Sequence, residues 1–166
     1  WTAATVSGTV SGFSNGSGST INDVLSGSGT VQYTVTPTLN GCTGIDGVID
    51  VVVNPRAVIS ISPSPASVCS GSSANISLVT TPAGATVSWT ALNVPGTVSG
   101  ATSGSGSTIT DVLSGVGTFS YEVTADLTGC LSKDTVVVNV LPVPALTNND
   151  TTICSSNSLG LVLKST

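Results

Sequence analysis

The chain has 166 residues, of which 39% are hydrophobic and only 7% charged, and its net charge is −5. Three Lys and Arg residues are too few for a basic nucleic-acid-binding surface, and no apolar run approaches the ~20 residues that a membrane-spanning helix needs. Histidine is absent, so neither a Cys–His nor a Ser–His–Asp catalytic set can form. We therefore expect no enzymatic activity, no cofactor, no nucleic-acid partner and no membrane span.

Strand-forming and turn-forming residues dominate the composition. Val and Thr are β-branched and favour strands, whereas Gly and Ser favour turns. The helix formers Glu, Lys, Gln and Arg are nearly missing, so we predict an all-β fold. The chain begins at Trp1 and shows no signal peptide, so we expect a processed chain or a piece of a longer one.

One stretch of the sequence occurs twice. Residues 1–42 and 89–130 align without a gap at an offset of 88 residues and are identical at 28 of 42 positions. A period of this length is too long for a solenoid repeat and indicates a tandem array of small domains. We denote residues 1–55 the first copy, residues 56–142 the second copy and residues 143–166 the third segment.

The first copy contains the later strands of a repeat. Residues 1–3 form the end of a strand and residues 20–25 a short strand. Residues 30–36 alternate apolar and polar side chains, which predicts a half-buried strand. Residues 50–54 form the last strand, which ends at Pro55. The first copy is therefore predicted to be the C-terminal part of a repeat.

The second copy contains a full set of strands. Short strands separated by Gly, Ser and Pro turns at a spacing of 8–12 residues are typical of a β-sandwich. The first predicted strand comprises residues 57–61 and 67–69 and is broken at Pro63 and Pro65. The following strands are residues 75–79, 85–91, 108–113, 118–124 and 135–140, and Pro142 ends the unit. The second copy is therefore predicted to be a complete repeat.

The third segment repeats the opening strands of the second copy. Residues 151–163 match residues 66–78 at four of thirteen positions, with Cys154 at the position of Cys69. Residues 161–163 then correspond to residues 76–78. The match is weak, but it lies where the period places it, so we predict the N-terminal strands of a following repeat.

Several short motifs of the second copy carry a family resemblance. They are Val-Cys-Ser-Gly at 68–71, Asn-Ile-Ser-Leu at 75–78, Ser-Trp-Thr at 88–90, Gly-Ser-Gly-Ser-Thr-Ile at 104–109, Tyr-Glu-Val-Thr at 121–124 and Thr-Gly-Cys at 128–130. With these motifs the chain resembles the PKD-like, immunoglobulin-like repeats of very large secreted proteins of Bacteroidetes. The resemblance implies tandem immunoglobulin-like β-sandwich domains, exported to the cell surface as adhesins, filaments or stalks.

The four cysteines are Cys42, Cys69, Cys130 and Cys154. They form no CxxC pair, so a zinc site is not expected. Their even number and repeating positions predict disulfides and an oxidising location, with four buried free thiols as the alternative. Cys69 precedes the second strand of its copy and Cys130 follows the strand carrying Tyr121. We predict that these two bond to each other, closing a loop of about 60 residues that stabilises the fold by roughly 4 kcal/mol.

Two aromatic positions recur in both copies. Trp1 and Trp89 share one position, and Tyr33 and Tyr121 share another. A tryptophan on the third strand of an immunoglobulin-like sandwich packs against the disulfide in the core, so we predict that these aromatic residues are core residues. Tryptophan also stacks on sugar rings. A glycan-binding module of a secreted adhesin, with surface glycans as partners, is therefore the alternative function.

The acidic residues are too scattered to predict a site. Asp23 and Asp111 share a repeat position, and we interpret both as solvated carboxylates. Calcium needs several converging oxygens, and the sequence has no DxDxD run. A carboxylate pair for glycoside hydrolysis would have to recur in both copies, and few acids do. The Gly/Ser runs at 17–19 and 103–107 lack the Lys of a phosphate loop and are interpreted as mobile turns.

Five residues lie in triplets that resemble glycosylation signals. Three are in Asn-x-Ser/Thr sequons. The other two are in the triplets Asp134-Thr135-Val136 and Asp150-Thr151-Thr152, which resemble the Asp-Ser/Thr-apolar O-glycosylation signal of Bacteroidetes. The five residues are Asn15, Asn75, Asn149, Thr135 and Thr151.

Neither end of the chain carries a complete set of strands, and an open half-sandwich exposes sheet edges and an apolar face. We predict that residues 143–166 of one molecule supply the opening strands to residues 1–55 of the next, with Cys154 bonded to Cys42 of that neighbour. Head-to-tail contacts that do not close a ring generate a filament. The sequence therefore predicts an extracellular structural protein whose main partner is itself, as a head-to-tail homopolymer or as one continuous tandem array, in a filament or an adhesin stalk.

Overall fold

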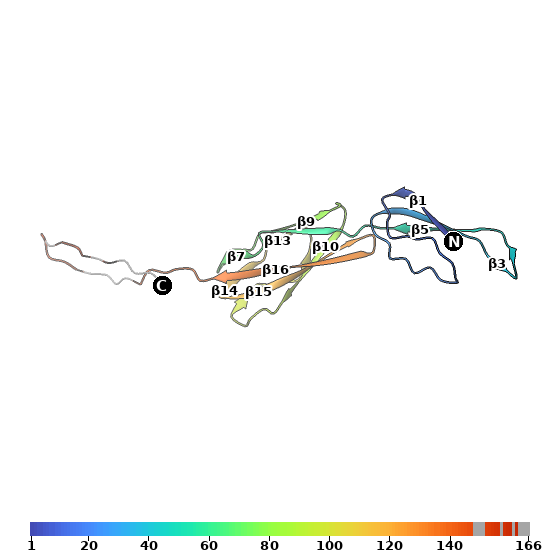
Figure 1. Cartoon of the computed structure of the whole chain (residues 1–166). Helices are drawn as coiled ribbons and strands as arrows, with labels where there is room; N and C mark the ends of the chain where they lie inside the picture. Colours follow the sequence, from blue (N-terminus) through green and yellow to red (C-terminus); the bar gives the residue numbers. More distant parts are fainter. Residues whose placement is uncertain (148–151, 157, 161, 163–166) are drawn as a thin grey trace. The chain divides into compact units, whose positions relative to one another are not determined.

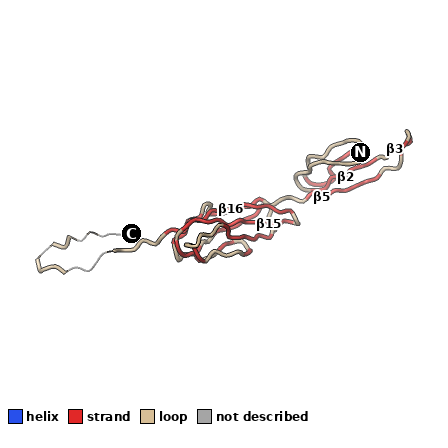
Figure 2. Tube along the Cα trace, turned by 90° about the horizontal axis from the view of Figure 1, so that it is seen from below, coloured by secondary structure: helices blue, strands red, loops and turns tan. Residues whose placement is uncertain are grey.

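The computed structural model describes residues 1–147, 152–156, 158–160 and 162, and within these the chain forms strands and loops without a helix (Figure 2). The predicted all-β class is confirmed. No helix in this described part could cross a membrane. The strands are β1 (Thr2–Gly8), β2 (Gly29–Val35), β3 (Thr38–Leu39), β4 (Cys42–Thr43), β5 (Gly47–Val53), β6 (Val58–Ser62), β7 (Ala66–Cys69), β8 (Ser72–Ser73), β9 (Ile76–Thr81), β10 (Thr86–Leu92), β11 (Val98–Ser99), β12 (Gly104–Ser105), β13 (Thr108–Ile109), β14 (Val112–Gly115), β15 (Gly117–Leu127) and β16 (Cys130–Leu141).

The chain divides into two compact units. The first comprises Trp1–Ser60, Val79–Ser88 and Thr124–Asp134, and the second comprises Ile61–Leu78, Trp89–Val123 and Thr135–Thr166. The division runs through β6, β9, β10, β15 and β16 and does not separate the repeats. The boundaries at residues 55 and 142 therefore stay predictions from the sequence.

The first copy forms a three-stranded antiparallel sheet in the order β1-β2-β5 (Figure 1). Ala3 of β1 and Ile49 of β5 lie opposite Tyr33 of β2. The alternation predicted for this strand is present, because Val31 and Tyr33 are buried. With Val10 they form a core against which partly buried apolar side chains pack, among them Trp1, Ile21, Leu25, Val51 and Val53.

The second copy is built from three sheets. A five-stranded sheet has the order β12-β10-β15-β16-β7, and two three-stranded sheets have the orders β13-β9-β6 and β11-β14-β8. Figure 1 labels β10, β15, β16 and β7 of the larger sheet. Alternate side chains of β15 and β16 are buried, as period-two strands with one covered face require. The buried side chains of these two strands and of β9 are Phe119, Tyr121, Val123, Ala125, Val136, Val138, Val140, Ile76 and Leu78.

The strand predicted at residues 20–25 of the first copy is wrong, because no residue from 20 to 25 belongs to a strand. The matching residues of the second copy do form strands, since β13 pairs with β9 and β14 pairs with β8. Residues 1–55 contain no counterpart of β8 or β9. The segment therefore lacks the partner strands that would complete its backbone hydrogen bonds.

The disulfide predicted between Cys69 and Cys130 is not confirmed, because the structure has all four cysteines as free thiols. β7 runs parallel to β16, with Cys69 opposite Leu141. Cys130 is the first residue of β16, eleven positions before Leu141. At about 3.3 Å per residue these positions are roughly 36 Å apart, whereas bonded cysteines have Cα atoms within about 7 Å of each other.

Candidate functional site

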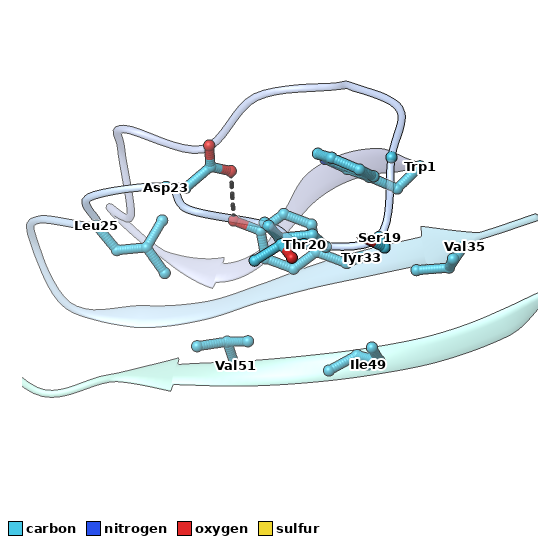
Figure 3. A pocket seen from close by; sticks show the side chains of 11 residues that line it. Trp1, Ser19, Thr20, Asp23, Leu25, Tyr33, Val35, Ile49 and Val51 are labelled. Atoms are coloured by element: carbon cyan, nitrogen blue, oxygen red, sulfur yellow. Dashed lines mark hydrogen bonds between the residues drawn. The ribbon is translucent and has the colours of Figure 1, made fainter.

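The first copy carries an open apolar groove of about 570 Å³. Its floor is the sheet with Val35, Ile49 and Val51, and the loop that contains Asp23 and Leu25 forms a wall beside this sheet (Figure 3). The lining residues are Trp1, Gly18, Ser19, Thr20, Ile21, Asp23, Leu25, Tyr33, Val35, Ile49 and Val51. All of them belong to the first copy, and most are apolar.

The second copy shows what covers the equivalent surface. Ile109, the counterpart of Ile21, lies opposite Ile76 of β9, and the backbone N–H of Leu78 donates to the carbonyl oxygen of Ser107 at 2.8 Å. Ile109 is fully buried, whereas Ile21 is only partly buried. The groove is therefore the place where a strand equivalent to β9 lies in the complete repeat.

An Asp–Tyr hydrogen bond closes one wall of the groove, and Figure 3 marks it with a dashed line. The Tyr33 hydroxyl donates to Asp23 Oδ2 at 2.7 Å, and both the backbone N–H and the hydroxyl of Ser14 donate to the same carboxylate. The hydrogen bond from Tyr33, supported by those from Ser14, lowers the pKa of Asp23. Burial, followed by the contact with Asp23, raises the pKa of Tyr33 to about 12.

The second copy repeats this arrangement. The Tyr121 hydroxyl donates to Asp111 Oδ2 at 2.6 Å, and Thr102 donates through its backbone N–H and its hydroxyl, both at 2.7 Å. Burial is the main cause that raises the pKa of Tyr121, with the hydrogen bond to Asp111 second. These carboxylates are therefore not simply solvated, as the sequence had suggested. The sequence carries a signal for this hydrogen bond, because in both copies the aspartate lies ten residues before a tyrosine.

A glycine next to the first Gly/Ser run and a glycine within the second lie against the two tryptophans. A Cβ atom added to Gly16 would lie 2.6 Å from Trp1 Cζ2, and one added to Gly104 would lie 2.7 Å from Trp89 Cζ2. Trp89 is only 9% exposed. Gly16 and Gly104 therefore lie directly against the two indoles, and neither glycine leaves room for a sugar ring at that contact.

The indole nitrogens of the two copies differ. Trp1 Nε1 donates to the carbonyl oxygen of Ser14 at 3.1 Å. Trp89 Nε1 is buried and has no hydrogen-bond partner among the described residues. The tryptophan of the second copy is thus held by apolar packing, whereas that of the first copy also has a polar anchor at the rim of the groove.

The other residues singled out in the sequence do not gather into a site. Asn15 is exposed, and its Oδ1 accepts a hydrogen bond from the backbone N–H of Ala3 at 2.8 Å. Asn75 and Thr135 are exposed on the second copy, whereas Asn149 and Thr151 lie outside the described residues. Within the described part of the chain, no group of three or more His, Cys, Asp or Glu side chains is placed to hold a metal ion.

Comparison with known proteins bears on the second copy. A family model described as the PKD-like domain matches residues 66–144. This match supports a PKD-like, immunoglobulin-like fold for these residues. Domains of this kind are commonly found in extracellular proteins. No curated protein matches the chain.

Proposed function

We propose that the protein is a non-enzymatic structural element of an extracellular filament or adhesin stalk, built from PKD-like β-sandwiches in tandem. In this proposal the groove of the first copy receives residues 143–166 of a neighbouring molecule. The observation that carries it is a difference between the copies. The counterparts of residues 20–25 are paired with β9 and β8 in the second copy, and the same residues are unpaired in the first.

The third segment has the features of the missing strands. Cys154 lies at the position of Cys69, and in both places the next two residues form a turn. The second turn residue has a positive φ in each case, 85° at Gly71 and 74° at Ser156. This local agreement supports the alignment of the third segment with β7 and the turn after it.

Residues 161–163 supply the apolar side chains that the groove lacks. Leu161 and Leu163 align with Ile76 and Leu78, which are 0% and 3% exposed in the second copy. Complete burial of a side chain of this size contributes roughly 1.5–3 kcal/mol, and an added strand also satisfies the open backbone groups of the edge. These two side chains are the anchors that the proposal assigns to the segment.

The connectivity of the second copy favours exchange between molecules. The chain enters this copy at Ala57, whose carbonyl oxygen accepts a hydrogen bond from Ser132 near the start of β16. It leaves after Leu141, at the end of the same strand. The twelve residues of β16 extend for about 40 Å. A donor on a second molecule can reach the groove without folding back along this length, and repeated donation produces a filament.

The test uses the full chain and two variants, examined by negative-stain microscopy and sedimentation. The wild-type chain should form fibres. The double variant Leu161→Asp, Leu163→Asp should remain monomeric, because it places carboxylates where the buried anchors belong. The matched control is Val162→Asp, because residue 162 aligns with Ser77, which is exposed in β9, and this variant should still polymerise.

A wild-type chain that stays monomeric at high concentration would overturn the proposal, as would fibres that tolerate the double substitution. Retention of the monomer on a glycan column, abolished by Trp1→Ala without loss of folding, would instead establish the glycan-binding function.

A further inference from the structure

We infer that each joint between successive copies is closed by a disulfide, linking the cysteine where one copy ends to the cysteine where the next begins. In the filament the bonds join Cys154 of one molecule to Cys130 of the next, and Cys69 to Cys42 of the next. The inference rests on the proposed strand exchange. It replaces both pairings predicted from the sequence.

The two cysteines of a complete repeat lie at its two ends. Cys130 begins β16 close to Ser132, whose hydroxyl donates to Ala57 where the chain enters the copy. Cys69 lies opposite Leu141, where the chain leaves. We call these the leading and the trailing cysteine. A trailing and a leading cysteine of the same sandwich are too far apart to bond, so Cys154 and Cys42 could not pair inside one composite sandwich.

A cavity in the first compact unit shows where a trailing cysteine belongs. Its volume is about 410 Å³, and all of its lining residues are in that unit. They are Leu25, Ser26, Gly27, Val53, Asn54, Arg56 and Cys130. The thiol of Cys130 also lies 3.7 Å from the carbonyl oxygen of Asn54, to which it donates. The leading cysteine of the second copy therefore faces the end of the first copy.

The second copy identifies the occupant of this cavity. Leu113 and Gly115 are the counterparts of Leu25 and Gly27, and they hold the turn after Cys69. The backbone N–H of Gly71 donates to the Leu113 carbonyl oxygen at 2.7 Å, and the N–H of Gly115 donates to Ser70 Oγ at 2.9 Å.

In the composite sandwich, Ser155 and Ser156 of the neighbour take the positions of that turn. Cys154 of the neighbour is then brought to the cavity that Cys130 lines. The same rule applies at the other joint, where Cys69 of one molecule meets Cys42, the counterpart of Cys130, in the next. All four cysteines are used, and each pair of neighbours is joined twice.

The thiols are accessible for this reaction, since Cys42, Cys69 and Cys154 are exposed and Cys130 is partly exposed. One thiolate of a pair attacks an external disulfide, such as oxidised glutathione, and releases one thiolate from it. The second cysteine then displaces the other half of that reagent from the mixed disulfide. One sulfur–sulfur bond forms in the protein, one breaks in the reagent, and two thiol protons pass to the two released thiolates.

The experiment polymerises an equal mixture of unlabelled and ¹⁵N-labelled full chains with oxidised glutathione, followed by peptide mapping without reduction. The expected map contains Cys154–Cys130 and Cys69–Cys42 peptides, half of them mixed in label because the bonds join different molecules. A denaturing gel without reductant should show a ladder that collapses to monomer when thiols are restored. Cys130→Ser alone should keep the ladder, because the second bond remains, whereas Cys130→Ser with Cys42→Ser should abolish it.

Cys69–Cys130 or Cys42–Cys154 peptides would overturn the inference, as would fibres whose thiols stay free under oxidising conditions. The last result would leave strand exchange standing, because it would show fibres without covalent joints. A chain that forms neither fibres nor a ladder would reject the strand exchange itself and the bonds that depend on it. The Cys130→Ser, Cys42→Ser variant separates the two ideas, because it should form fibres by microscopy but no ladder on the gel.

Discussion

The first and second copies contain almost the same seven residues in two different states. Residues 19–25 and 107–113 differ only at Asn22, which is Thr110 in the second copy. The segment in the second copy contributes to β13 and β14, whereas the segment in the first copy forms no strand. Strand formation here is decided by whether a partner strand is present, since β-propensity mainly reflects the packing of neighbours.

The largest difference in stability loss between the two copies should result from substitution of the tryptophans. Trp89→Ala removes a side chain that is 91% buried, since 9% is exposed, and should cost about 3–5 kcal/mol of unfolding free energy. Trp1→Ala should cost clearly less, because its indole is only partly buried at the groove. Denaturant unfolding with amide hydrogen exchange would assign each loss to its copy, and equal losses would contradict the comparison.

Substitution of the two tyrosines should cause the next largest loss of unfolding free energy. Tyr121→Phe removes a hydrogen bond from a fully buried side chain to a carboxylate and should cost about 1.5–3 kcal/mol. Tyr33→Phe makes the same change in the open copy and should cost less. Thermal unfolding of both variants is the measurement. A larger loss of stability for Tyr33→Phe than for Tyr121→Phe would contradict the expectation that the open first copy depends less on this hydrogen bond.

These hydrogen bonds also predict the dependence of the first copy on pH. The raised pKa of Tyr33, about 12 in the folded protein, makes a contribution to stability that is complete below pH 10 and is lost as the pH rises through 12. The lowered pKa of Asp23 makes a contribution that is present above its ordinary pKa of 3.8 and is lost as the pH falls through the folded value. Tyr33→Phe should remove the alkaline loss in hydrogen exchange of the first copy.

The glycine contact with the indole should have an intermediate effect. Gly104→Ala places a methyl group 2.7 Å from Trp89 Cζ2 and should cost about 1–3 kcal/mol through overpacking. Gly96→Ala is the matched control, because a Cβ atom there has no neighbour within 4 Å. It should leave the melting temperature unchanged or slightly higher. If Gly104→Ala behaves like this control, the indole is not held by the Gly/Ser run.

The smallest effect should come from a single methyl group. Ile109→Val should cost about 0.5–1.5 kcal/mol, because Ile109 is fully buried. Ile21→Val should cost less in the isolated chain and approach the Ile109→Val value once fibres form. Unfolding of monomer and fibre, compared for both variants, would measure this change. A cost for Ile21→Val that is the same in both states would mean that nothing covers Ile21.

Much of this architecture follows from the sequence alone, because it depends on local patterns. The repeat of residues 1–42 at 89–130 and the alternation around Val31 and Tyr33 are visible in the chain itself. β-branched residues with a period of two favour strands that bury one face. The all-β class and the central strands were therefore predictable without any knowledge of long-range contacts.

The cysteine positions and the state of residues 20–25 were decided only by the tertiary structure. Which cysteines can meet depends on the parallel register that places Cys69 opposite Leu141, and register is a relation between strands distant in sequence. Likewise, whether Ile21 joins a sheet depends on a strand that residues 1–55 do not contain. Local sequence sets which residues can form a strand and which side chains can be buried. Partner and register are set by long-range pairing, because a β-strand satisfies its backbone groups only through another segment.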